Sequence, residues 1–257
     1  MQTTAPATTI DDVLERLRQI IRHAEATGNT MGYFAALYHR VTAEVKHKIA
    51  EGYFDDGARM ARLDVCFANR YLEAYDAYRE GRPVTRAWQY AFDAAGTKRY
   101  IVLQHLFLGM NAHINLDLGI AAAETAPGEA IASLENDFKK INTILTGMID
   151  EVQRQLAAIW PLLHLLDRLA LRTDEKLAAF SMGKARDAAW HNALELSRMN
   201  GTAAAASIDA LDAKVIDYAE LVARPGPLAT TLFLLVRLGE RGSVTRKITI
   251  LDSANTL

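Results

Sequence analysis

Hydrophobic residues recur with the period of an α-helix along nearly the whole chain. Residues 30–51 are typical, because their large apolar side chains return every three or four positions. Short breaks containing Gly or Pro separate such segments, and only the tail VTRKITIL, residues 244–251, has the pattern of a short strand. One strand cannot form a sheet. We therefore predict an all-α fold, a multi-helix bundle with antiparallel neighbours.

The spacing of the breaks predicts a single domain over residues 1–257. No linker is marked by a shift in composition, and half of the residues are apolar, enough for a sizeable core. We expect that core in residues 30–200, with helices of residues 201–240 packed on it and a tail at 243–257.

Composition argues against several classes of protein. The net charge is −2 and no basic cluster is present, so we expect no nucleic-acid partner. The longest apolar runs are shorter than the ~20 residues of a transmembrane helix. Cys66 is the only cysteine and the N-terminus lacks the pattern of a secretory signal, so we expect a cytoplasmic protein. A homodimer is left open.

One apolar segment, QHLFLGMNAHINLDLG at residues 104–119, carries an unusual number of polar side chains. A buried polar group without a partner costs about 1–3 kcal/mol, so these groups either satisfy one another or bind something. The segment belongs to a helix predicted at about residues 98–123. Because that helix is apolar on most sides, we predict that it is the buried central helix of the bundle.

On a regular helix, successive residues are about 100° apart, so these polar side chains cannot all meet one ligand. Asn111 and Asn115 share one face with Gln104. His113 and Asp117 lie one turn apart on nearly the opposite face, and His105 falls between the two sets.

Each set has more than one interpretation. His113 and Asp117 can form a structural hydrogen bond, provide two ligands to one metal ion such as Zn or Fe, or act as a histidine oriented by a carboxylate. Asn111 and Asn115 can bond a neighbouring helix or orient a small molecule in a pocket.

Two further residues are candidates. Asp64 lies in the apolar stripe of its helix, and Asp is seldom buried unless paired, so we expect a partner from another helix or a metal ion. Trp190 is a core residue or a substrate contact. It lies beside a second pair, Asp187 and His191, which could converge with the first pair on one site.

Several motifs together resemble an uncharacterised all-helical bacterial family, a domain of unknown function with an N-A-H-I-N-x-D-L core helix. They are LGMNAHINLDL (108–118), YHRVTAEV (38–45), GYFDD (52–56), LDVCFANRY (63–71), NDFKKIN (136–142) and AWHNALEL (189–196). The resemblance spans roughly residues 30–200 and implies a helical fold, but no activity.

A weaker resemblance is to the zinc phospholipase C and P1-nuclease group, which also places His-x-x-x-Asp on a core helix. Here those positions are His113 and Asp117. The N-terminal Trp ligand is missing, and the Pro-x-His that should follow the Asp is replaced by LGIAAAE. This resemblance implies zinc chemistry by analogy alone.

The leading hypothesis is an enzyme that acts on a small or lipid-like molecule between helices. His113 and Asp117, with Asp64 and His105, would act as acids and bases. Alternatively His113, Asp117 and Asp64 would hold a divalent metal for a hydrolase or oxygenase. A metal-free cyclase-type enzyme is the next alternative. The competing class is a non-catalytic ligand-binding or structural protein with buried polar networks.

Overall fold

The computed structural model describes residues 5–97, 99–160 and 182–253, and their regular structure is entirely helical, which confirms the all-α prediction. The helices are α1 (Ile10–Thr27), α2 (Met31–Ala50), α3 (Gly57–Arg79), α4 (Arg86–Ala95), α5 (Val102–Met110), α6 (Leu118–Thr125), α7 (Ile131–Ile159), α10 (Met182–Leu196), α11 (Gly201–Ala223), α12 (Pro227–Gly239) and α13 (Val244–Asp252). A π-helical segment η1 (Asn111–Asp117) joins α5 to α6, and a 3-10 turn η2 (Gly128–Ala130) precedes α7.

Local signals set the ends of the first helix. Thr9 caps α1 by accepting a hydrogen bond from the backbone N–H of Asp12, whose own carboxylate accepts one from the backbone of Thr9. Gly28 ends the helix in the left-handed region, at φ 63°, where other residues are disfavoured.

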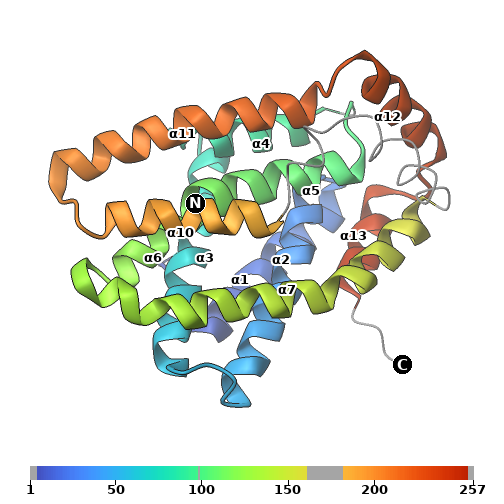
Figure 1. Cartoon of the computed structure of the whole chain (residues 1–257). Coiled ribbons are helices and arrows are strands. Elements are labelled where there is room, and N and C mark those ends of the chain that lie inside the picture. The colour runs from blue at the N-terminus through green and yellow to red at the C-terminus, as the bar shows by residue number, and fades with distance from the viewer. Residues whose placement is uncertain (1–4, 98, 161–181, 254–257) are drawn as a thin grey trace.

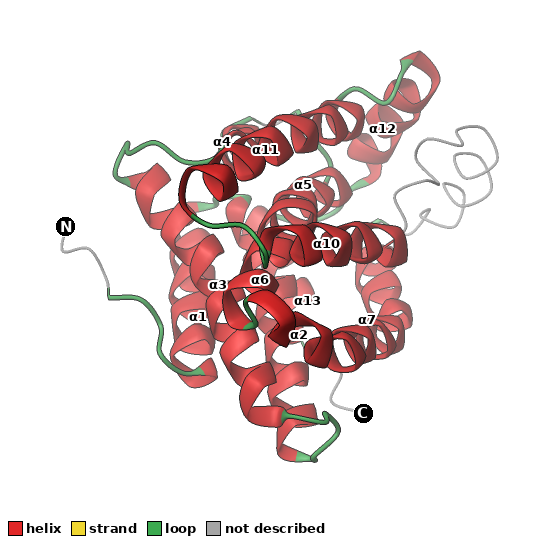
Figure 2. Cartoon of the chain, turned by 60° about the vertical axis from the view of Figure 1, so that its left-hand side comes forward, coloured by secondary structure: helices red, strands yellow, loops and turns green. Residues whose placement is uncertain are grey.

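The predicted central helix is formed by α5, η1 and α6 in succession. Helices α2, α3, α4, α10 and α11 all contact this run, and Figure 2 shows it between α3 on one side and α7 on the other. By length and composition, Val102–Thr125 could cross a membrane. Since 83% of its most apolar stretch is buried inside the fold, it is not a clear transmembrane segment.

Two long helices flank the central run, α11 on one side and α7 on the other, with α10 between them (Figure 1). Helix α10 packs closely on α6. Gly119 allows this approach, because a Cβ atom there would lie 2.8 Å from the backbone oxygen of Ala189.

The prediction of a short strand at residues 244–251 is wrong. This segment forms α13, which begins where the Ser243 side chain accepts a hydrogen bond from the backbone N–H of Arg246. Ile248 and Leu251 are fully buried, and Ile248 fills the space left by Gly32 on α2. The tail is thus part of the core. The apolar pattern of the sequence also predicts a helix just after Pro161 and another from about Asp174 to Met199; the first, and the start of the second, lie outside the described residues.

Candidate functional site

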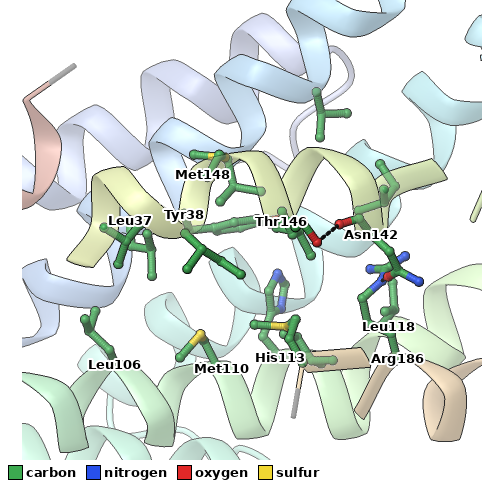
Figure 3. Close-up of a pocket in the computed structure, with 18 of the residues that line it drawn as sticks. Leu37, Tyr38, Leu106, Met110, His113, Leu118, Asn142, Thr146, Met148 and Arg186 are labelled. Atoms are coloured by element: carbon green, nitrogen blue, oxygen red, sulfur yellow. Dashed lines mark hydrogen bonds between the residues drawn. The ribbon is translucent and has the colours of Figure 1, made fainter. Parts of the chain in front are cut away.

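A cavity of about 610 Å³ lies between the central helix and α7, and α2, α3 and the start of α10 complete its walls. This volume is within the usual range of small-molecule sites. Figure 3 shows its side chains facing one another from these helices, with Leu106 and Met110 opposite Met148. The walls are almost wholly apolar, so the few polar groups in them stand out.

His113 is one of these polar groups. Its ring stacks on Phe67, with centroids 3.6 Å apart and planes at 7°, and meets the edge of Tyr38 at 4.5 Å. Nδ1 lies 3.4 Å from Oδ2 of Asp117, whereas the buried Nε2 has no hydrogen-bond partner in the described part of the chain. Burial lowers the pKa of His113, which favours the neutral imidazole. We infer that Nδ1–H donates to Asp117 and that Nε2 carries the lone pair.

Asp117 is held by two other helices. Its Oδ1 accepts a hydrogen bond from Nε of Arg70 at 2.9 Å, and its Oδ2 accepts one from Nε1 of Trp88 at 2.8 Å. With both oxygens occupied, the carboxylate fixes the orientation of His113. This geometry favours the histidine oriented by a carboxylate, or a structural pair, over two free metal ligands.

Asp64 is the second polar group of the cavity wall, and it lies one turn before Phe67 on α3. Its side chain is buried, and Oδ2 has no hydrogen-bond partner among the described residues, so the expected partner from another helix is not seen. Burial raises the pKa of this carboxyl to about 7. Tyr38, also in the wall, has its pKa raised by burial as well.

The predicted metal site of His113, Asp117 and Asp64 depends on which of their side-chain atoms are available to bind an ion. Within residues 5–97, 99–160 and 182–253, no group of three or more His, Cys, Asp or Glu side chains could hold a metal ion. The atoms that remain without partners are one nitrogen of His113 and one oxygen of Asp64. A third ligand from Asp117 would have to displace Arg70 or Trp88. The metal site therefore stays a prediction that this geometry does not favour.

The structure does not bring the predicted substrate amides to the cavity. Asn111 donates to the backbone oxygen of Val215 on α11 at 3.0 Å, and Asn115 donates to Oδ1 of Asn111 at 2.8 Å. Gln104 similarly binds α11, through the backbone oxygen of Val222. These amides fix the central helix to α11, which fits the structural alternative.

His105 also lies away from the cavity wall. It is buried with its ring edge-on to Tyr33 and Tyr100, at centroid distances of 5.7 and 6.0 Å. Burial lowers its pKa to about 4. The position of His105 therefore does not support the prediction that it acts as an acid or base together with His113.

The second His/Asp pair lies on the surface. His191 is exposed and pairs with Glu195 at 3.3 Å, and Asp187 is exposed as well, so the two pairs do not converge. Trp190 is half-buried against Phe138, at a centroid distance of 4.9 Å, and is not part of the cavity wall. It is a packing residue.

The sequence interpretation missed three residues of the wall: Tyr38, Phe67 and Arg186. Tyr38 and Phe67 looked like ordinary members of apolar stripes, although Phe67 follows Asp64 by three positions. The π-helical geometry was missed too. In η1 the hydrogen bonds span five residues, as from the backbone N–H of Leu118 to the oxygen of His113. Such segments are frequent at functional sites.

The comparisons with known proteins identify a family but no activity. Residues 10–225 match the model of DUF5995, a family of unknown function. No curated protein and no solved structure matches the chain, so the weaker resemblance to the zinc phospholipase C group gains no support. The match extends beyond the residues 30–200 expected from the motifs and covers most of the chain. The chain therefore belongs to the DUF5995 family, which confirms the resemblance of its motifs to an uncharacterised helical family.

Proposed function

We propose that the protein is an enzyme that carries out general acid–base chemistry on a small, largely apolar molecule in the cavity. One observation carries the proposal: Nε2 of His113 is buried in the cavity wall and has no hydrogen-bond partner among the residues that the structure describes, while Asp117 holds Nδ1. An unsatisfied buried group costs about 1–3 kcal/mol and calls for an explanation. A lone pair kept free to accept a proton from a substrate provides one.

Asp64 is the natural acid of this scheme. With a pKa of about 7 it is about half protonated at neutral pH, whereas the lowered pKa of His113 keeps the imidazole neutral at that pH. A neutral base and a protonated acid in one apolar cavity form the combination that proton transfer requires. His113 would remove a proton from the substrate, and Asp64 would return one at another atom.

A metal-dependent hydrolase or oxygenase is the less supported version, since of the three predicted ligands only His113 and Asp64 have a buried side-chain atom without a hydrogen-bond partner among the described residues. A non-catalytic binding protein is the second candidate. The contacts of Asp117 with Arg70 and Trp88 favour it, because they join α3 and α4 to the central helix and so have a structural use in themselves.

Comparing His113→Asn with the parent tests the proposal. The amide of Asn can occupy the place of Nδ1 and donate to Asp117, but has no atom at the place of Nε2. The exposed His191→Asn is the matched control. Each folded protein is incubated with a lipid and small-molecule extract, and the extract is analysed by mass spectrometry.

We expect at least one compound to be consumed by the parent and by His191→Asn, and about 10²-fold more slowly by His113→Asn. Equal consumption by all three proteins would remove His113 from the chemistry. Compounds retained by the parent but never converted would favour the binding protein. Metal analysis of the same samples tests the metal-dependent version.

A further inference from the structure

Arg186 on α10 is a cation buried in the wall of the same cavity. Its side chain is 4% exposed, and Figure 3 shows it beside Asn142 and Leu118. Nη2 donates to the backbone oxygen of Phe138 at 2.6 Å, Nε donates to Oδ1 of Asn142, and the guanidinium lies 4.5 Å from the centre of the Phe138 ring. Although burial lowers its pKa to about 10, Arg186 remains charged at neutral pH.

The hydrogen-bond partners of this guanidinium are neutral. No carboxylate in residues 5–97, 99–160 and 182–253 forms a direct ion pair with it; the adjacent Asp187 is exposed, and its charge only partly offsets the effect of burial on the pKa of Arg186. A buried guanidinium that no carboxylate contacts is costly, and Arg is rarely buried unless paired. An anion bound in the cavity would supply the missing partner.

The cavity is elongated, with Arg186 near one end. The residues of α7 that line it run from Phe138 to Leu156, eighteen positions or about 27 Å at 1.5 Å per residue. On the central helix the lining runs from Leu103 to Leu118, about 22 Å. Arg186 contacts Phe138, whereas the region around Leu103 and Leu156 is lined mainly by apolar side chains and carries no charged one, Gln153 being its polar residue. The shape suits a chain that is anionic at one end.

We propose that this cavity binds a long-chain monocarboxylate, with the carboxylate on Arg186 and the hydrocarbon chain extending toward Leu103 and Leu156. A guanidinium matches a carboxylate geometrically, and a single cation balances a single negative charge better than a phosphate dianion. The inference rests on the proposed function, since it names the substrate class of the same site. His113 is five residues from Leu118, less than about 8 Å along the helix, and so lies beside the carbons that follow the carboxylate.

Binding of three amphiphiles with the same chain tests the head-group assignment without any mutation. The full-length protein, freed of bound lipid, is titrated by calorimetry with dodecanoate, dodecanol and dodecyl phosphate. We expect dodecanoate to bind about 10-fold to 100-fold more tightly than dodecanol, as a charged hydrogen bond implies. Equal binding of the two, or tighter binding of dodecyl phosphate, would overturn the proposal.

Substitutions then test whether Arg186 is the residue that binds the carboxylate. Arg186→Gln should bind dodecanoate and dodecanol alike, Arg186→Lys should keep part of the preference, and the exposed control Arg82→Gln should keep all of it. A preference that survives in folded Arg186→Gln would contradict the assignment. Absence of a carboxylate preference in the parent, or its persistence in Arg186→Gln, reports a failure of this inference, whereas unchanged turnover in His113→Asn reports a failure of the proposed function.

Discussion

Replacing Asp64 with Asn should make the protein more stable than its parent at high pH but not at low pH. Burial raises the pKa of Asp64 from 3.8 to about 7, whereas in the unfolded chain it titrates near its ordinary value. Between these pH values the folded protein keeps a proton that the unfolded chain has released. The free energy of unfolding therefore falls by about 1.4 kcal/mol per pH unit.

Summed over the interval, this loss is about 4 kcal/mol. The contribution of Asp64 to stability is fully present below pH ~4 and is lost as the pH rises through the folded pKa of about 7. Asn has no proton to release and escapes this loss. Since Oδ2 has no hydrogen-bond partner in the described part of the chain, the uncharged amide should be tolerated there.

Urea unfolding of the parent and Asp64→Asn between pH 4 and pH 8.5 measures the effect, with the exposed Asp217→Asn as control. The difference between Asp64→Asn and the parent should grow by about 4 kcal/mol across the range, while the control difference stays flat. A constant difference for Asp64→Asn would refute the reasoning, because it would mean that the cavity does not hold this carboxyl protonated.

Two comparisons between variants test the packing of the helices. Asp117→Ala should lower the free energy of unfolding by about 3–5 kcal/mol, because it leaves buried donors and a guanidinium without their acceptor. Chemical denaturation of Asp117→Ala and His113→Asn should give the smaller loss for His113→Asn, and the reverse order would contradict the network. Gly119→Ala should cost about 1–3 kcal/mol, since its Cβ would press on the backbone oxygen of Ala189. At Gly147 no atom of the described residues lies within 4 Å of an added Cβ, so Gly147→Ala should instead stabilise α7 by about 0.5–1 kcal/mol. Thermal unfolding measures both variants, and an equal shift of their melting temperatures in the same direction would argue against close packing at Gly119.

Most of the fold was predictable because its signals are local. The cap at Thr9, the left-handed Gly28 and the apolar stripes each act within a few residues. The exception is α13, whose β-branched residues favoured a strand. There the spacing of Ile248 and Leu251, and a tertiary contact with α2, outweighed propensity.

The site was predictable only in part, because its polar residues could be found but not their partners. His113, Asp117 and Asp64 are conspicuous as polar groups in apolar stripes. Arg70 and Trp88, which hold Asp117, come from positions 47 and 29 residues away and carry no local sign of that role. Long-range contacts of this kind depend on how helices dock, which periodicity alone does not encode.

The π-helical segment η1 allows the arrangement of the site residues to change while the packing of the helices on either side stays the same. A π turn accommodates one residue more than an α-helical turn, and here that surplus lies in Asn111–Asp117, between two α-helical halves that pack independently on their neighbours. Loss of a single residue from this segment is the smallest change that could restore a continuous α-helix while leaving both halves in place. Within the family, a one-residue gap at this point would therefore distinguish chains that share the architecture from chains that also retain the arrangement of His113 and Asp117.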